Sequence, residues 1–334
     1  MSLHLEFPSA ADAAARAAFA TLGEPGADPL DGAVSLALAG PAAAPRARAS
    51  LWLAHDLAGA PGRTGMIGHY AAADAEAGPA LLAAARAELA RRGAVRVVGP
   101  MNGGTWRRYR VELPREPGDP DVQPPRFASE PVNPPRDAAD FEAAGFGVVS
   151  RYESRYEARP VVDPEAGARV RARAEAHGYR LHALDPARFG DTLASMHALS
   201  LGAFADNAWY APLPLDEFLA LYAPYRERAV PSLVRLATAP DGALAGYLFG
   251  FPDPLALADG RPTRTVCKTV AVAPSARGAG LGGLLLDDFR AASVALGARG
   301  IVHALMHVDN TSMRMSARHH SVLFKRYALY GWTP

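Results

Sequence analysis

The chain has 334 residues, of which 49% are hydrophobic and 21% are charged, and its net charge is +1. This length favours two domains, and the composition is that of a globular protein without a membrane-spanning run of about 18 apolar residues. The near-neutral charge excludes a strong general attraction to nucleic acid or to an anionic membrane. The single cysteine, Cys267, excludes an internal disulfide and a shared thiolate metal site. The opening sequence MSLHLEFPSA lacks a basic segment followed by an apolar one, so we expect a cytoplasmic protein.

The first half of the chain alternates strand-like and helix-like segments. Hydrophobic patterning predicts two strands, a strong helix and a short apolar strand at 46–54, 64–72, 79–92 and 94–99. The stretch 114–135 holds eight prolines, which excludes a regular helix or a central strand and predicts an extended surface loop. A short helix at 137–144 and a strand at 148–157 follow, and residues 159–166 are the expected linker.

The second half contains a unit of strand, glycine-rich turn, helix and strand. Its parts are 265–272, 281–296 and 301–308, so these two strands are expected to be parallel neighbours joined by a crossover helix. The remaining predicted elements precede this unit: a strand at 179–184, helices at 186–204 and 215–222, and strands at 232–237 and 243–251.

The two halves show an internal repeat when Gly93 is set against Gly297, an offset of 204 residues. The sequence LARRGAVRVV then falls on SVALGARGIV, and both helices carry an apolar stripe and end in glycine before an apolar strand. A duplicated domain is the interpretation that this repeat favours.

At the same offset, the turns that precede the two helices differ in charge. The second half carries Arg277, Gly278 and Gly280, whereas the first half carries Asp74 and Glu76. A helix N-terminus with bare N–H groups binds anions, and two fixed carboxylates there repel a diphosphate. The sequence therefore predicts a site for a phosphorylated ligand in the second half and none in the first.

The sequence VAVAPSARGAGLGGLLL, which starts at Val270, carries the most specific chemical signal. Pro274 ends the strand, and the glycines allow positive φ angles and a close approach of ligand to main chain. Arg277 adds positive charge to the helix dipole and to a nest of N–H groups. The spacing is neither the dinucleotide fingerprint nor the Walker pattern. A tight strand-to-helix connection without a ligand is the structural alternative.

The pattern V-x-V-x-P-x-x-R-G-x-G-x-G, with a following amphipathic helix and a strand ending near Asn310, resembles the GNAT acyltransferase superfamily over residues 178–334. The resemblance implies an α/β (α+β) fold of two GNAT-like domains, each a mixed twisted β-sheet flanked by helices. Residues 1–160 would form a degenerate copy without a coenzyme A signature, and residues 167–334 the domain with the acyl-coenzyme A loop.

The resemblance also implies roles for the residues that match the motif. Val270 and Val272 would contact the pantetheine arm or the acyl carbonyl through their main chain, in a gap where the strand splays from its neighbour. Asn310 would hold the arm from the other strand. The coenzyme A pyrophosphate would lie on the loop of Arg277, Gly278, Ala279, Gly280 and Gly282.

The sequence departs from the family pattern after Asn310, where many members place a tyrosine about seven residues further along a helix. Here the next tyrosines are Tyr327 and Tyr330, after a longer basic segment. Tyr327 is the predicted general acid and Tyr330 the reserve, through a lengthened helix. Ordinary packing is the alternative for each.

Other side chains have both a functional and a structural interpretation. His303 and His307 share one strand face about 13 Å apart without a third ligand, so no metal is expected. His307 and Asp309 are possible acid–base groups, and a buried thiol is expected for Cys267. His319 and His320 are expected in a solvated helix. Candidates for an acceptor pocket are Phe204, Asn207, Trp209 and Tyr210, with Trp106, Arg107 and Arg108 from across the domain interface.

The sequence thus predicts an N-acyltransferase that moves an acetyl or other acyl group from acyl-coenzyme A directly to a small-molecule or peptide amine. Acetyl-coenzyme A or another acyl-coenzyme A is the expected co-substrate, without metal, nucleic acid or membrane as partner. A non-catalytic protein that binds or senses acyl-coenzyme A is the alternative.

Overall fold

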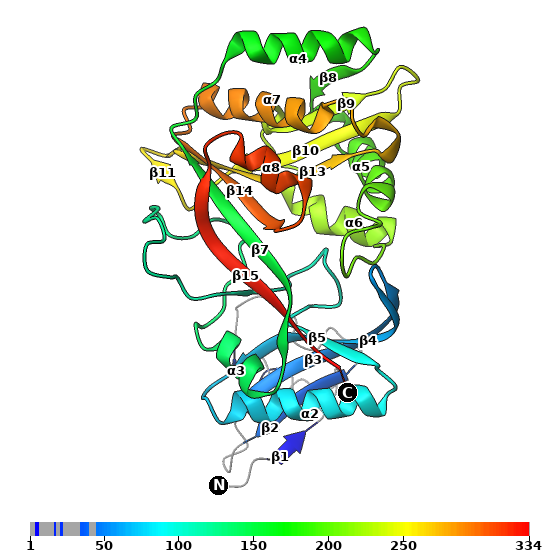
Figure 1. Cartoon of the computed structure of the whole chain (residues 1–334), viewed down its shortest axis with the longest axis vertical. Coiled ribbons are helices and arrows are strands. Elements are labelled where there is room, and N and C mark those ends of the chain that lie inside the picture. Colours follow the sequence, from blue (N-terminus) through cyan, green and yellow to red (C-terminus); the bar gives the residue numbers. More distant parts are fainter. Residues whose placement is uncertain (1–3, 7–16, 18–20, 23–33, 40–44, 334) are drawn as a thin grey trace.

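The structure, a computed structural model, describes residues 4–6, 17, 21–22, 34–39 and 45–333. One thirteen-stranded sheet runs through this part of the chain in the order β1-β2-β3-β4-β5-β15-β7-β14-β13-β10-β9-β8, with β6 beside β15. Strands of the first half lie at one end of the molecule and strands of the second half at the other, and β7 and β15 cross between them (Figure 1). The mixed sheet with flanking helices confirms the predicted fold class.

The elements of the first half match the predicted segments, with three described strands, β1, β2 and β6, that were not predicted. In chain order they are β1 (His4–Glu6), β2 (Val34–Ala39), β3 (Pro45–Leu57), β4 (Ala60–Ala72), α2 (Ala77–Arg91), β5 (Arg96–Gly99), β6 (Val111–Glu112), α3 (Asp137–Ala143) and β7 (Gly147–Ala158).

The second half adds one helix that the sequence interpretation missed. Its elements are α4 (Pro164–Ala176), β8 (Arg180–Ala183), α5 (Phe189–Ala203), α6 (Leu215–Tyr222), β9 (Val234–Thr238), β10 (Leu244–Pro252), β11 (Leu257–Ala258), β12 (Arg261–Pro262), β13 (Arg264–Val272), α7 (Leu281–Ala295), β14 (Gly300–His307), α8 (Thr311–Ala317) and β15 (Val322–Trp332). The predicted linker 159–166 is wrong at its end, because Pro164 begins α4 and the Asp163 carboxylate accepts the Glu165 N–H at 3.0 Å. No described helix is both long and apolar enough to cross a bilayer.

The two halves exchange their last strands. β7, from the first half, lies between β14 and β15 of the second half. β15 in turn reaches β5 of the first half, where Tyr330 pairs with Gly99 and Trp332 with Val97. The division into domains 1–160 and 167–334 stays a prediction, and these two strands join the halves into one continuous sheet.

The repeat in the sequence has a counterpart in the structure. Helices α2 and α7 begin 204 residues apart (281 − 77) and end 204 residues apart (295 − 91). Gly93 and Gly297 follow them with φ angles of +88° and +86°. In each half a parallel strand pair flanks the helix, β4 with β5 and β13 with β14. These matches support the interpretation of the two halves as copies of one unit.

The proline-rich segment 114–135 forms no helix and no strand and is largely exposed, as predicted, but a few of its residues are buried. Phe127 belongs to the buried cluster of the second half, with its ring 6.1 Å from that of Phe324 in β15, and Glu130 is buried. Arg264 of β13 holds the segment by donating hydrogen bonds to the carbonyl oxygens of Pro124 and Arg126. Its guanidinium also pairs with the buried carboxylate of Asp253, Nε to Oδ2 at 2.8 Å. These contacts anchor the surface loop to the second half's core.

Candidate active site

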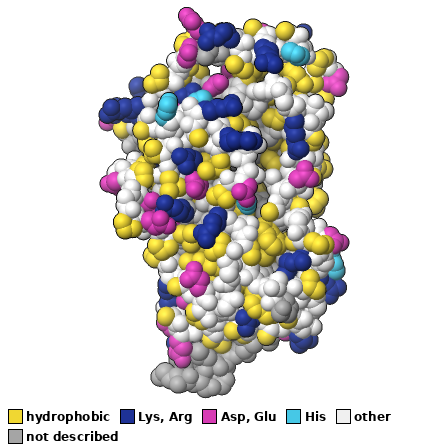
Figure 2. All heavy atoms as spheres, in the orientation of Figure 1, with side chains coloured by type: hydrophobic (Ala, Val, Ile, Leu, Met, Phe, Trp, Pro, Cys, Tyr) yellow, Lys and Arg dark blue, Asp and Glu magenta, His cyan; other side chains and the backbone are white. Residues whose placement is uncertain are grey.

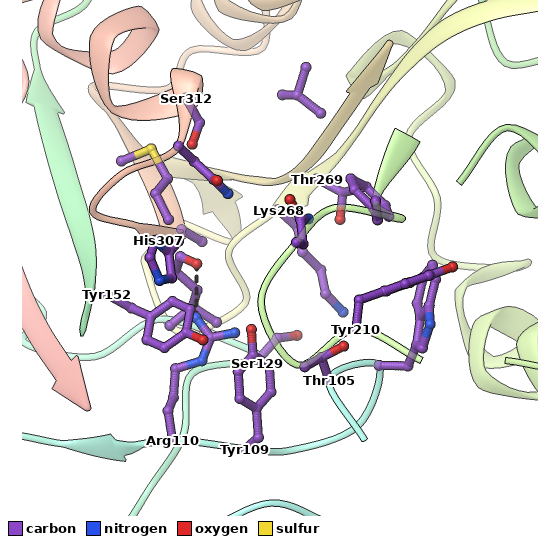
Figure 3. A pocket seen from close by; sticks show the side chains of 18 of the residues that line it. Thr105, Tyr109, Arg110, Ser129, Tyr152, Tyr210, Lys268, Thr269, His307 and Ser312 are labelled. Carbon is purple, nitrogen blue, oxygen red and sulfur yellow. Dashed lines mark hydrogen bonds between the residues drawn. The ribbon is translucent and has the colours of Figure 1, made fainter. Parts of the chain in front are cut away.

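The candidate site lies where two parallel strands separate. β13 and β14 pair from Arg264 with Gly300 to Cys267 with His303, and no further along either strand. A cavity of about 630 Å³ opens beyond this point, lined by both strands, by α8, by residues 204–210 and by residues 105–110 of the first half (Figure 3). The predicted splay of the strand that carries Val270 and Val272 is thereby confirmed.

Both strands are irregular at the cavity. In β13, Thr269 pairs with Phe249 and Cys267 with Gly250, so Lys268 is the extra residue of a β-bulge. In β14, Leu305 has a φ of +56°, and its register against β7 shifts between His303 and Met306. Bulges end strand pairing and change the direction of side chains, and they are common beside active sites. Here the two bulges direct Lys268 and the end of β14 toward the cavity.

The glycine loop before α7 is open to ligand. Gly278 and Gly280 have φ angles of +87° and +77°, and a Cβ added at either would meet no atom within 4 Å. Gly280 is the N-cap of α7 and supplies no side chain to the first N–H groups of the helix. Arg277 is exposed beside this turn. The loop therefore presents bare N–H groups, positive charge and space to an anion.

The predicted coenzyme A residues lie around one end of the cavity. Val270 and Asn310 line it, whereas Val272 and loop 277–282 are not among its described lining residues. The loop nonetheless adjoins it, because a Cβ at Gly282 would lie 3.6 Å from Val272 and 3.3 Å from Met315 of the lining. The glycine loop and the cavity are therefore neighbours that share the side chain of Met315.

The corresponding turn of the first half is filled by its own carboxylate. Asp74 Oδ1 accepts the N–H groups of Glu76 at 3.1 Å and Ala77 at 2.9 Å, where an external anion would bind. The hydrogen bond from Ala77 is the main cause that lowers the pKa of Asp74. Arg46 pairs with both Asp74 and Glu76. This helix N-terminus is already neutralised within the chain.

The two tyrosines predicted as acids are buried in structural positions. The expected lengthened helix is wrong, since α8 ends at Ala317 and both tyrosines lie in β15. Tyr327 is fully buried and donates to Glu130 Oε1 at 2.9 Å. Tyr330 packs in the first half's core, stacked on Phe141, and donates to Glu142. Neither ring is among the described residues that line the cavity.

Replacing Tyr327 by phenylalanine separates the two roles of this residue. The change removes a hydrogen bond to a charged buried carboxylate, so we expect the free energy of unfolding to fall by about 1.5–3 kcal/mol in a denaturant titration. An acid role predicts instead a fall in kcat of about 100-fold or more. A large loss of kcat at unchanged stability would return the proton-donor role to Tyr327.

His307 is one of the titratable residues that line the cavity. Burial lowers the pKa of its imidazole below the usual 6.5; the nearby Asp309 carboxylate opposes this shift and Arg110 adds to it. Asp309 also donates its N–H to Nδ1 at 3.2 Å, and its carboxylate lies 3.8 Å from that atom. The ring stacks edge-on against Tyr152 at 5.1 Å. His307 is therefore neutral at pH 7 and able to accept a proton.

His303 and His319 have structural partners and Cys267 is buried, although His303 and Cys267 also border the cavity. His303 lies 3.4 Å from Glu157 of β7, and Glu157 is held by Arg290 of α7 at 2.6 Å, which ties the exchanged strand to its new neighbours. Burial raises the pKa of the Cys267 thiol to about 12, as a buried thiol requires. His319 follows the end of α8 rather than lying in a solvated helix, and its Nε2 is 3.6 Å from Asp287.

The cavity extends across the two halves, as the sequence interpretation expected. Its lining includes six of the seven candidates named for the acceptor pocket: Phe204, Asn207, Tyr210, Trp106, Arg107 and Arg108. Trp209 instead donates its indole N–H to Ser150 at 2.9 Å. The lining residues that the sequence interpretation missed include Tyr109, Arg110, Tyr152 and Lys268. A lysine within an apolar strand was the available signal for Lys268.

Solved structures of one class share this architecture. A GCN5-related N-acetyltransferase from Sphaerobacter thermophilus superposes with a TM-score of 0.52 over 99% of this chain and 95% of its own, at 16% identity. A tandem GNAT protein from the clavulanic acid biosynthesis pathway, in a structure without acetyl-coenzyme A, gives 0.50 over 99% and 98%, at 15% identity. Eis1 from Mycobacterium abscessus gives 0.51 over 99% and 74%, at 16% identity. The chain therefore has the GNAT fold. No family model and no curated protein matches its sequence.

Proposed function

We propose that the chain is an N-acyltransferase that uses acyl-coenzyme A. The observation that carries this proposal is the splay of β13 from β14, with a bare, cationic glycine loop at one end and a cavity at the other. The fold shared with N-acetyltransferases supports it. The loop does not match the Walker nucleotide-binding pattern, since it lacks the Gly-Lys-Ser/Thr that this pattern requires.

In this proposal the glycine loop 277–282 holds the pyrophosphate through main-chain N–H groups, and Arg277 adds a positive charge. The main chain at Val270 and Val272, which β14 leaves unpaired, holds the pantetheine arm from one side, and Asn310 approaches from the other. A main-chain N–H of the splayed segment stabilises the developing oxyanion, an interaction worth about 3 kcal/mol in other acyl transfers.

His307 takes the proton from the acceptor ammonium in this scheme, directly or through a water. The lone pair of the neutral ring is on Nδ1, which accepts the Asp309 N–H at 3.2 Å, so it takes the proton when this weak contact opens, and the Asp309 carboxylate stands 3.8 Å from Nδ1 to stabilise the imidazolium. Positioned general bases of this kind contribute about 100-fold or more to rate. The Asp309 side chain is 87% exposed, so the proton can pass on to solvent.

In this proposal the first half contributes lining residues to the site and does not bind a second coenzyme A. Asp74 occupies its helix N-terminus, and Arg46 neutralises that carboxylate. Residues 105–110 of the first half line the cavity of the second. The tandem arrangement therefore builds one active site from two copies of the fold.

The burial of Tyr327 and Tyr330 favours a second candidate, a protein that binds acyl-coenzyme A without chemistry. A thiol-release assay with acetyl-coenzyme A and a panel of primary amines distinguishes the two. The acyltransferase proposal predicts amine-dependent release of free coenzyme A. Thermal protection by coenzyme A without thiol release from any amine would favour the binding protein.

A further inference from the structure

We infer that the acceptor is an amine that also carries a carboxylate, and that Lys268 and Arg110 recognise this carboxylate. The inference rests on the proposed function and names the substrate class for the same site. The observation that carries it is an excess of positive charge over negative charge among the side chains that face the cavity.

Lys268 brings a positive charge to the cavity without a counter-ion. The β13 bulge turns its side chain toward the cavity (Figure 3). Its ammonium lies 5.9 Å from the ring centroid of Tyr222 and 5.6 Å from that of Tyr225. Its Nζ has no hydrogen bond or ion pair to any residue that the structure describes. A half-buried ammonium held only by ring faces gains from an anionic partner.

Arg110 adds a second, more deeply buried charge to the same cavity. It is 7% exposed, and its guanidinium lies between the rings of Tyr109 at 3.8 Å and Tyr152 at 4.1 Å. Its Nη1 donates to the Leu305 carbonyl at 2.8 Å, while its buried Nε has no partner. Among the described carboxylates, none pairs with it. A buried cation without a counter-ion is costly, so a bound anion is stabilised there.

The carboxylates of the lining do not offset these charges. Asp206 and Asp309 are the acidic residues among the described lining, and both side chains are 87% exposed. Neither therefore supplies a buried negative charge to the interior. Figure 2 shows several Lys and Arg side chains on the face above the junction of the two halves. A polycationic acceptor would find no buried counter-ion here, whereas an anionic group would find two.

These cations are too far along the strand to serve the coenzyme A phosphates. Lys268 precedes Val272 by four residues, or about 13 Å of extended strand, and the glycine loop begins five residues beyond Val272. The positive pair therefore lies on the acceptor side of the reacting centre. Aromatic side chains of the same cavity, Trp106, Phe204 and Tyr210, provide an apolar surface for the rest of the acceptor.

The test compares acids with matched amides. Thiol release is measured with the twenty common L-amino acids, with their carboxamides and with 1,4-diaminobutane. For the best acid we expect kcat/KM to exceed that of its amide by about 10- to 100-fold, the range of a charged hydrogen bond. Lys268→Met should reduce this acid-to-amide ratio by a similar factor, mainly through KM, and Lys268→Arg should retain most of it.

Calorimetric titration of the same acids and amides into the protein saturated with coenzyme A measures recognition without chemistry. Acid binding that weakens about 10-fold or more in Lys268→Met supports the inference, whether or not thiol is released. The absence of thiol release from every amine would overturn the proposed activity and not the inference. Equal use or binding of acid and amide, a preference for 1,4-diaminobutane, or an acid-to-amide ratio unaffected by Lys268→Met would overturn the inference. Binding of neither acid nor amide would also overturn it.

Discussion

Replacing Arg264 by methionine is expected to lower the free energy of unfolding by about 3–5 kcal/mol, the cost of breaking a buried ion pair by removing one partner. The Arg264 guanidinium lies 2.7 Å from the carboxylate of Asp253, which is fully buried. The change removes this partner and leaves a buried carboxylate without a counter-ion. It also removes the hydrogen bonds that hold the carbonyl groups of Pro124 and Arg126. Denaturant unfolding measures the change directly, and segment 114–135 should become more sensitive to protease.

The exposed Arg261, three residues earlier, is the matched control, and Arg261→Met should change stability by less than about 0.5 kcal/mol. Adding Asp253→Leu to Arg264→Met removes the stranded carboxylate and should recover part of the loss. Equal stability of Arg264→Met and Arg261→Met would show that this ion pair does not hold the loop.

Replacing His307 by glutamine is expected to lower kcat by about 100-fold or more in the thiol-release assay, because it removes the group that accepts the proton. The direction of the pKa shift of His307 predicts how kcat depends on pH. Since burial lowers the pKa of His307, the wild-type kcat should be fully developed above 6.5 and fall as the pH drops through a value below 6.5. The glutamine variant should lack this acidic fall.

His182, which is exposed on β8, provides the control, and His182→Gln should leave kcat and its pH dependence unchanged. A variant at His307 with full kcat and an unchanged acidic limb would assign the proton to water or to another group. A rise in KM alone would make His307 a binding residue.

The fold of the second half could be predicted from local signals. The helix 281–296, its glycine exit and the two flanking strands each have a pattern of their own, and the offset of 204 residues relates them to the first half. The exchange of β7 and β15 could not be predicted, because a strand's sequence states which face is buried and not which neighbour it pairs with. Helix α4 was missed because Asp163 and Pro164 were assigned to the linker 159–166, whereas Pro164 begins a helix.

The part of the site that is formed by main-chain groups could be predicted from the sequence. The part where side chains from distant segments meet could not. The geometry of the glycine loop could be predicted from the sequence, since the positive φ angles at Gly278 and Gly280 favour glycine. Arg110 and Lys268 are 158 residues apart (268 − 110) and face one cavity only through tertiary packing. Tyr327 was expected on a helix, because the spacing from Asn310 assumed a helix that in fact ends at Ala317, and it lies in β15 instead.

The most direct measurement is a calorimetric titration of coenzyme A into the wild type, Gly280→Asp and Gly280→Asn. Gly280 has a φ of +77° and no neighbour within 4 Å of an added Cβ, so both side chains fit and share the same backbone cost, and they differ in charge. We expect one coenzyme A per chain, with affinity reduced by about 100-fold or more in the aspartate variant and largely kept by the asparagine variant. Two equal sites per chain, or equal affinity in both variants, would contradict the assignment of the glycine loop as the single coenzyme A site.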